Sequence, residues 1–459
     1  MKWLVMHNKS EAQKITMSEL PLKIKHFPDV PNFHSQYHKD SSEEALKRKA
    51  LSIPFLQEFI TPKPPKPRIV PSADGSLERI LFTIPACVTA DYENNPLWKV
   101  YCDLLKKLPS YTRLIILTHE SNHLFVWHWL EDNGFADRID LGHLPNYLDF
   151  TVWAEDAYVA ITDEESKQTY LVEPHSFPRS SDELIAEAVS GFTEIKTIQS
   201  PLYFEGGNIL AGDDFFFIGA DYAVKTLGYV KEIISPKDGE TKPDLIYRLY
   251  QEYFDTSKRL IFIGATIPVP TRRVKEFERN GKTWSEIFYI KNKGGTVQPL
   301  FHIDMFMTFG GRQANGKYQL IIGDPRLAAE ILGQKVSPYA MPEVFDNIAN
   351  NLQRIGFEVV RNPLPLTYMD DPEERERYWY FATANNSLVE IKSQEDKTIW
   401  IPTYGHGSWP ELKATDEANK AFYESLGFKV IMLGDFHPFA EHSGSVHCIK
   451  KYISRGKRE

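Results

Sequence analysis

The sequence predicts an α/β fold, and three features of the 459-residue chain indicate it. Apolar runs of strand length alternate with helical stretches from about residue 79 onward, which is typical of α/β proteins. Apolar residues make up 42% of the chain, enough for a large core. A helix end, a Gly-Phe pair and a strand recur at 352–360 and 423–431, and partly at 130–141, which suggests a repeated unit.

The first part of the chain is expected to lie outside this fold. Residues 1–78 are predicted to form an N-terminal extension that contains the proline-rich run TPKPPKPRIVPSADG (61–75). Its five prolines restrict the backbone and prevent helix formation, so we interpret the run as a linker or as a strap over the surface. Residues 79–459 are expected to form a catalytic α/β domain. Whether the extension is a lid, a dimer arm or a targeting element is left open.

Four predicted elements open the domain in the order strand, helix, strand, helix. They cover 78–90, 94–109, 112–120 and 121–135. Asn95 can cap the first helix and Pro96 suits its first turn, while Gly134 is placed to end the second helix. Apolar residues of the first helix fall on one face, which is expected to pack on the strands.

Charge and composition exclude several function classes. The chain carries 62 acidic and 53 basic residues without a basic stripe, so nucleic-acid and anionic-membrane partners are not expected. No apolar run is long enough to span a bilayer and the N-terminus lacks a secretory pattern, which favours a cytoplasmic location. Three cysteines without a CxxC pair predict neither a disulfide framework nor a zinc site.

Charged residues interrupt apolar strands in four segments. These are FTVWAEDAYVAIT (150–162), LYFEGGNILAG (202–212), PLFHIDMFMTFGG (299–311) and EHSGSVHCIKKY (441–452). A buried charge is costly unless it is paired, so each segment needs an explanation. Taken singly, each has a structural one: Asp156 could cap a turn, Glu205 could precede a glycine turn, His302 could be a core histidine, and Cys448 a small apolar residue.

Taken together, the four segments supply a thiol, an imidazole and several carboxylates. These groups can serve as nucleophile, acid/base and cation clamp. Serine-based hydrolysis fits less well because no G-x-S-x-G motif is present. His302, His442 and His447 do not have helical i, i+4 spacing, so we expect no metal and no cofactor.

In this order the segments resemble the motifs of the guanidino-group-modifying enzymes (the pentein superfamily), and of agmatine deiminases in particular. The matching motifs are VWAED, FEGGNIL, FHIDMF and SGSVHCIKKY, with ATANNSLVE and KTIWIPTYGH between the last two. The resemblance covers about residues 79–455. It implies a pentein α/β propeller, with five ββαβ-type units around a pseudo-fivefold axis and the site at the centre.

The resemblance also assigns roles to residues. It implies Cys448 as the nucleophile, His302 as acid and base, and Glu205 as the hydrogen-bond partner of His302. The residues that it places at the substrate are Asp156 and Asp304, which would clamp a guanidinium, together with Trp153, Glu155 and Asn208.

The chain departs from the family pattern at two places. Agmatine deiminases usually have an arginine where Glu155 stands, and we expect this change to make the pocket more acidic. Ser443-Gly444-Ser445 replaces a glycine run before the cysteine. His447 is expected to point away from the nucleophile's face and to be structural.

The function expected from these features is a cysteine-dependent deiminase acting on a small guanidino substrate such as agmatine or an arginine derivative. It would release ammonia through a covalent thiouronium intermediate. Alternatives are a peptidyl-arginine deiminase, an amidinotransferase and a non-catalytic binding protein. Arg312 and Arg272-Arg273 are candidates to meet a carboxylate at the substrate's far end. A homo-oligomer is left open.

Overall fold

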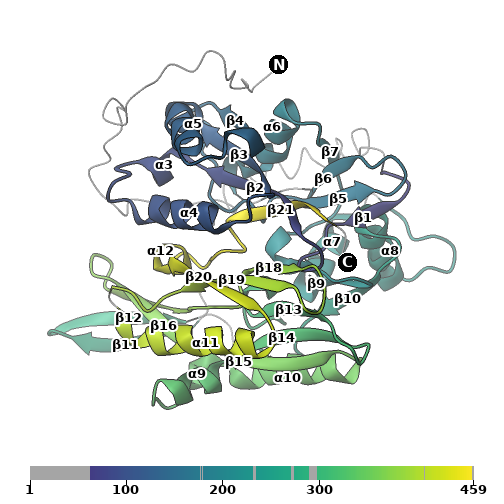
Figure 1. Ribbon diagram of the computed structural model, residues 1–459. Coiled ribbons are helices and arrows are strands. Elements are labelled where there is room, and N and C mark those ends of the chain that lie inside the picture. The colour runs from purple at the N-terminus through teal and green to yellow at the C-terminus, as the bar shows by residue number, and fades with distance from the viewer. Residues whose placement is uncertain are drawn as a thin grey trace.

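The computed structural model describes residues 63–456, except 176, 178, 231–233, 270–272, 289–296 and 408. Within these residues the strands form six sheets, and the fold is mixed α/β, as the sequence predicts. In Figure 1 the C-terminal strand β21 lies near the middle of the molecule, where it forms an edge of the N-terminal sheet.

The N-terminal sheet contains the first predicted elements. Its order is β21(Lys450–Arg455), β2(Leu77–Ile84), β3(Arg113–His119) and β4(Ile139–Leu144). β2 is antiparallel to β21 and parallel to β3, and β3 is parallel to β4. The connecting helices are α3(Ala86–Thr89), α4(Pro96–Lys107) and α5(His123–Asp132). The first predicted strand is therefore too long, because the chain turns into α3 after Pro85.

Helix α4 agrees with its prediction in cap and packing. Asn95 accepts a hydrogen bond from the backbone N–H of Leu97, and Pro96 occupies the first turn. The buried apolar face comprises Leu97, Val100, Tyr101, Leu104 and Leu105. Burial of each such side chain contributes about 1.5–3 kcal/mol, which holds α4 on the sheet. Gly134 follows α5 with φ +78°, a conformation that favours glycine.

One strand pattern recurs in four further sheets. Two strands pair antiparallel, a helical crossover follows, and the next strand pairs in parallel with the second. The units are β5(Val159–Asp163), β6(Thr169–Glu173), α6(Ile185–Phe192) and β7(Lys196–Gln199); β8(Ile209–Ala211), β9(Phe215–Gly219), α7(Ala220–Val230), α8(Lys242–Phe254) and β10(Arg259–Ile263); β13(Met307–Arg312), β14(Tyr318–Asp324), α9(Pro325–Ile331), α10(Pro342–Arg354) and β15(Glu358–Pro363); β18(Leu388–Ile391), β19(Lys397–Thr403), α11(Lys413–Ser425) and β20(Lys429–Asp435).

The N-terminal sheet repeats the same pattern through β21, β2 and β3, so the described residues contain it five times. The two Gly-Phe pairs noted in the sequence occupy equivalent places. Gly356 links α10 to β15 and Gly427 links α11 to β20, both with positive φ. Short helical turns complete the chain: η3(Glu120–Asn122), η4(Ala136–Arg138), η5(Ser180–Leu184), η6(Gly206–Asn208), η7(Ile303–Met305), η8(Pro338–Ala340), η9(Pro410–Leu412) and α12(His437–Ala440).

A sixth sheet, which the sequence analysis did not predict, projects from the side of the molecule (Figure 1). Its order is β11(Arg273–Arg279), β12(Lys282–Phe288), β17(Glu376–Phe381) and β16(Leu366–Asp371). β12 and β17 are far apart in sequence but pair in parallel. The hairpin of β11 and β12 is antiparallel and charge-rich, and much of it is exposed.

The proline-rich run crosses several sheets before β2 begins. β1(Pro67–Ile69) pairs antiparallel with β5, and Ser72 exchanges hydrogen bonds with Ala211 at the start of the next unit. Arg455 donates to backbone carbonyls on both sides of this segment, including those of Ala73 and Val389. Residues 1–62 lie outside the described residues, so the division into an extension and a catalytic domain stays a prediction.

In the described part of the chain, the helices are too short or too polar to cross a bilayer.

Candidate active site

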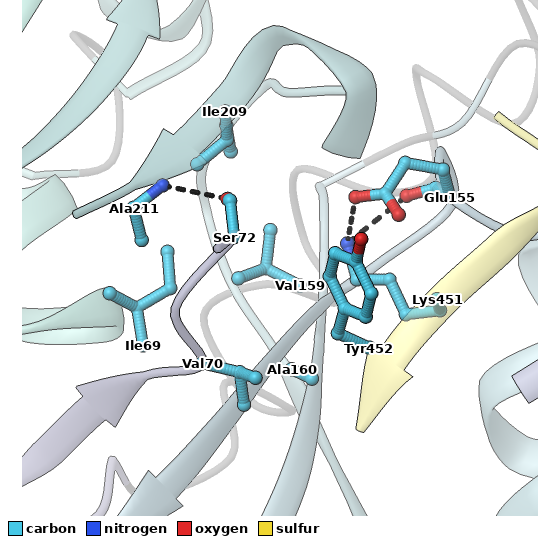
Figure 2. A pocket seen from close by; sticks show the side chains of 10 residues that line it. All are labelled: Ile69, Val70, Ser72, Glu155, Val159, Ala160, Ile209, Ala211, Lys451 and Tyr452. Carbon is cyan, nitrogen blue, oxygen red and sulfur yellow. Dashed lines mark hydrogen bonds and ion pairs between the residues drawn. The ribbon is translucent and has the colours of Figure 1, made fainter. Parts of the chain in front are cut away.

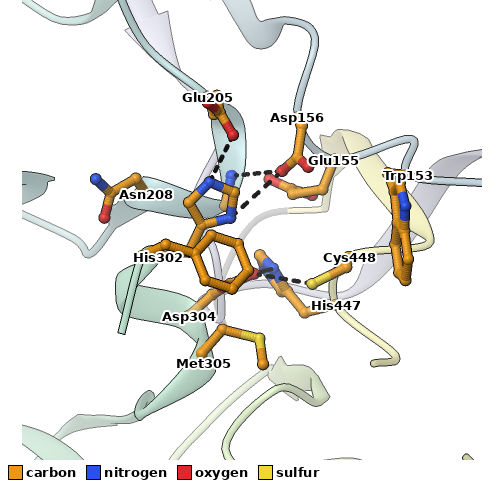
Figure 3. A network of polar contacts seen from close by, with 12 residues as sticks. Trp153, Glu155, Asp156, Glu205, Asn208, His302, Asp304, Met305, His447 and Cys448 are labelled. Atoms are coloured by element: carbon orange, nitrogen blue, oxygen red, sulfur yellow. Dashed lines mark hydrogen bonds and ion pairs between the residues drawn. The ribbon is translucent and has the colours of Figure 1, made fainter. Parts of the chain in front are cut away.

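The four charged segments meet at one place, and each of them lies just before the first strand of a unit. Asp156 precedes β5, Glu205 precedes η6 and β8, His302 and Asp304 lie at η7 before β13, and Cys448 precedes β21. Figure 3 shows these side chains gathered around a common centre. Loops at equivalent positions of the repeated pattern thus bring together residues that are up to about 290 positions apart.

His302 lies between two carboxylates. Its Nε2 is 2.9 Å from Oε2 of Glu205, and its Nδ1 is 3.7 Å from Oδ1 of Asp156. Burial alone would lower the pKa of His302, but the negative charges of Asp156 and Glu205 outweigh it and raise the pKa above 6.5. Burial also disfavours the charged form of Glu205, yet the bond to His302 lowers its pKa to about 2. The arrangement therefore favours a protonated imidazole.

Cys448 is buried beside a carboxylate. Its thiol donates to Oδ2 of Asp304 across 3.7 Å, and the amide Nδ2 of Asn386 is 3.2 Å from the sulfur. Burial raises the pKa of the Cys448 thiol well above 9, and the charges of Asp304 and Asp156 raise it further. Without a cation in the site, the sulfur is therefore held as a thiol.

His447 does contact the site, contrary to the expectation that it points away. Its Nδ1 is 2.8 Å from Oδ2 of Asp304. Burial and the charge of Lys450 lower the pKa of His447 to about 3, so the ring is neutral and Nδ1–H donates to Asp304. The role of His447 is to orient the carboxylate that also faces Cys448.

Asn386 belongs to the site but was not selected from the sequence. Its Oδ1 accepts hydrogen bonds from the backbone N–H groups of His447 and Cys448, while Nδ2 approaches the sulfur. It precedes β18, so the fifth unit also contributes a loop residue to the site. The segment ATANNSLVE was among the motifs that matched the family, but the sequence did not show which of its two asparagines would face the thiol.

Arg179 is a second residue that sequence reasoning missed. Its guanidinium donates to Oδ2 of Asp156 at 2.7 Å and to Oδ2 of Asp182 at 2.9 Å, and the side chain is 1% exposed. A single arginine in the polar run FPRSSDEL gave no signal, because only the folded loop places it behind Asp156.

We expected Glu155 to make the site more acidic, but two lysines pair with its carboxylate. Its two carboxylate oxygens accept hydrogen bonds from Nζ of Lys450 at 2.7 Å and from Nζ of Lys451 at 2.9 Å. Figure 2 shows the contact with Lys451 at the edge of a cavity of about 20 Å³, which is lined mostly by apolar side chains. That volume holds about one water molecule. The two lysines that follow Cys448 therefore compensate the charge of Glu155.

Trp153 and Asn208 connect the loops of the site. The ring of Trp153 packs against Gly444, where any Cβ would overlap it. Asn208 accepts a hydrogen bond from the backbone N–H of Ile303 at 3.0 Å and pairs with the amide of Gln298. Both side chains are buried, and their predicted contact with substrate stays a prediction.

Two of the arginines proposed to meet the far end of the substrate contact residues outside the site or lie on an exposed strand. Arg312 forms ion pairs with Asp213 and Asp214 at the end of β13. Arg273 begins the exposed strand β11, and Arg272 lies outside the described residues.

The two glycines after Glu205 have different steric roles. A Cβ on Gly206 would overlap the backbone oxygen of Glu155. A Cβ on Gly207 would lie 2.5 Å from Nδ1 of His302 and 3.1 Å from both Oδ1 of Asp156 and Oδ2 of Asp304. The bare Cα of Gly207 thus lets these three side chains converge close to its backbone, and we call the place where they converge the slot.

A metal ion is the other species that such residues could hold. Oxygen and nitrogen atoms of Asp156, Glu205 and His302 lie within 4.8 Å of one another. However, Arg179 already donates to Asp156, and the two carboxylates approach different nitrogens of the imidazole. Since a histidine binds one metal ion through one nitrogen, this geometry suits an imidazolium between two carboxylates better than a metal.

Comparison with known proteins gives matches in structure but not in sequence. No family model and no curated protein sequence matches the chain. A solved structure described as a proposed agmatine deiminase superposes with a TM-score of 0.58 at 11% identity, over 87% of this chain and 99% of its own. The agmatine deiminase of C. jejuni gives a TM-score of 0.54 at 13% identity, over 85% of this chain and 97% of its own.

These two structures show that the chain has the fold of agmatine deiminases, and thus the pentein fold that the resemblance implied. The sequence prediction of the fold is confirmed at that level.

Proposed function

We propose that the chain is a cysteine-dependent hydrolase that removes ammonia from a guanidino compound such as agmatine or an arginine derivative. The observation that carries the proposal is the slot in front of Gly207. Nδ1 of His302 lies at this place, and neither this atom nor the buried Oδ1 of Asp304 has a hydrogen-bond partner among the described residues. Buried polar atoms are rarely left unpaired, so their presence supports a ligand that completes them.

The carboxylates suit a planar cation. A guanidinium offers N–H donors in one plane, and carboxylates accept them in pairs. Oδ1 of Asp156 and the carboxylate of Asp304 would take these hydrogen bonds from opposite sides of the slot. Such a clamp would fix the central carbon of the substrate near the sulfur of Cys448, which is 3.7 Å from Oδ2 of Asp304.

The chemistry follows from the charges of these groups. The bound cation would favour loss of the thiol proton to solvent, and the thiolate would attack the guanidinium carbon to form a tetrahedral adduct. Protonated His302 would donate its Nδ1 proton to the departing nitrogen, so that ammonia leaves and a thiouronium remains. Neutral His302 would then take one proton from water as its oxygen bonds to the thiouronium carbon. The C–S bond would break, the second proton of the water would return to the sulfur, and a ureido product would leave.

We also propose that the five units close around a pseudo-fivefold axis with the slot at its centre. Five loops at equivalent positions supply Asp156, Glu205, His302 with Asp304, Asn386 and Cys448. Their convergence supports a ring, because equivalent loops of a cyclic arrangement meet at the axis.

An ammonia-release assay with agmatine, arginine, methylated arginine and an arginine-containing peptide tests the proposed function. We expect release from at least one guanidine without an added amine acceptor, since an amidinotransferase would require that acceptor. Cys448→Ala should abolish release, while the matched change Cys102→Ala, in a helix away from the slot, should retain it. Turnover by Cys448→Ala, or activity lost to a chelator and restored by zinc, would contradict the proposal.

A further inference from the structure

The proposed reaction requires an ionised Asp156 that is turned toward the slot. We infer, on the basis of that proposed function, that Arg179 is the positioning residue that keeps Asp156 charged and correctly oriented.

The two oxygens of Asp156 have separate partners. Arg179 donates from Nη1 to Oδ2 at 2.7 Å. The other oxygen, Oδ1, accepts from the backbone N–H of Gly207 at 3.3 Å and lies 3.7 Å from Nδ1 of His302. One oxygen is thus committed to the protein framework, and the other is left at the slot. Arg179 stands behind the clamp rather than in it.

The same guanidinium holds the loop that carries Asp156. Its Nε donates to Asp182, and Asp182 accepts from the backbone N–H and the hydroxyl of Thr151, both at 2.6 Å. Its Nη2 lies 3.4 Å from the carbonyl oxygen of Trp153. Thr151, Trp153 and Asp156 are therefore fixed from a single side chain.

Arginine is suited to this place for two reasons. Its planar fork can bind two carboxylates and a carbonyl at the same time, which the single ammonium of lysine does less well. It also remains charged when buried, because its pKa in water is above 12. Burial already raises the pKa of Asp182, and the charge of Arg179 opposes that shift. Without Arg179, the buried carboxylates of Asp156 and Asp182 would lose the cation that they share. Asp156 would then be left with the charges of His302, 3.7 Å from its Oδ1, and of Lys451.

A protonated Asp156 would lose most of its attraction for a guanidinium. Replacement of Arg179 is therefore expected to change the pH below which ligand binding is lost, in addition to any change in stability. A purely structural role would lower stability without moving that pH.

The test measures agmatine binding by calorimetry from pH 4 to pH 9 in a Cys448→Ala background, where no turnover occurs. In the Arg179→Met variant, we expect the acid limb of binding to move upward by one pH unit or more, which is about a tenfold loss of affinity on that limb. Arg179→Lys should keep the limb near its original pH but bind more weakly. Asp182→Asn removes a competing negative charge, so it should leave the limb in place or move it downward.

Arg312→Met is the matched control, because Arg312 also binds two aspartates but lies at the end of β13. It should leave the limb unchanged. An unshifted limb in folded Arg179→Met, or an upward shift in Asp182→Asn, would overturn the inference. If Arg179→Met does not fold, Arg179→Lys and Asp182→Asn decide in the same way. If wild-type protein releases ammonia but the acid limb of agmatine binding does not move in Arg179→Met, only this inference is wrong. Wild-type protein inactive on every guanidine defeats the proposed function, and this inference with it.

Discussion

Nε2 of His302 and Oε2 of Glu205 lie 2.9 Å apart in a setting where both side chains are buried. Each group shifts the other toward its charged form. The pKa of His302 is raised above 6.5, although burial opposes the shift, because Asp156 and Glu205 are negative. The pKa of Glu205 is lowered to about 2 by the same contact, against the effect of burial. The pair therefore couples stability to pH, and it would couple the proposed catalysis to pH as well.

The first prediction concerns activity. Glu205→Gln removes one of the negative charges that hold the proton on His302, so the pKa of His302 falls. Since protonated His302 is the proposed proton donor, the basic limb of the kcat profile should move to lower pH. The profile of ammonia release between pH 5 and pH 10 measures this shift. A basic limb that stays in place would show that His302 is not the donor.

The second prediction concerns stability. His302 has a raised folded-state pKa, so its contribution is complete below 6.5 and is lost as the pH rises through the folded value. Glu205 has a lowered folded-state pKa, so its contribution is complete above 4.5 and is lost as the pH falls through about 2. Both contributions are present between about pH 4.5 and 6.5.

Urea unfolding across pH measures this dependence. The difference in unfolding free energy between wild type and the double variant Glu205→Gln/His302→Asn should be largest between those two values. A difference that keeps growing above pH 8 would contradict the direction assigned to His302.

Sequence patterns predicted most of the fold, but they predicted only part of the candidate site. The alternation of apolar runs predicted an α/β fold. The order of the motifs linked it to a known architecture, because the strands and the loops of the candidate site follow one another in a fixed order along the chain. Helix α4 followed from its cap and apolar face. The sixth sheet was missed because β12 and β17 pair across almost a hundred residues, and no local pattern indicates such a pairing.

The partners of the site residues could not be predicted in the same way. Glu155 was expected to face the substrate, but Lys450 and Lys451 neutralise it from the next strand. Arg179 and Asn386 act through contacts between distant loops. A sequence shows which side chains carry charge, whereas their pairing depends on the tertiary positions of the loops.

The third prediction uses the slot. Gly207→Ala places a methyl group 2.5 Å from Nδ1 of His302, within the space proposed for the guanidinium. We expect kcat/KM to fall by two orders of magnitude or more, since even a small misplacement of reacting groups can cost about a hundredfold. Gly228→Ala is the matched control, because a Cβ at this helical position meets no atom within 4 Å. Full activity of Gly207→Ala would place the substrate elsewhere.

The fourth prediction concerns the thiol. Burial, Asp304 and Asp156 raise the pKa of Cys448 well above 9, so iodoacetamide should alkylate it slowly at pH 7.5. A bound guanidinium brings positive charge to the same place and should lower the thiol pKa. The alkylation rate against pH, followed by mass spectrometry of the Cys448 peptide with and without a weak guanidine ligand, tests this. An apparent pKa that the ligand leaves unchanged would argue against a cation beside the sulfur.

The fifth prediction concerns the buried charges next to Cys448, the proposed nucleophile. Glu155 binds two lysines, so Glu155→Gln leaves two buried ammonium groups without a carboxylate, whereas Lys450→Met leaves Glu155 paired with Lys451. Removing the sole partner of a buried charge costs about 3–5 kcal/mol. We expect a loss of that size for Glu155→Gln and a clearly smaller one for Lys450→Met.

Urea unfolding of both single variants and of Glu155→Gln/Lys450→Met measures these costs. The double variant should lose less free energy than the two single losses combined, because one unpaired cation is removed together with the carboxylate. Additive losses would mean that Lys450 and Glu155 stabilise the fold independently. In that case the charge of Glu155 would not be compensated by Lys450, and the site next to Cys448 would be more acidic than the contacts imply.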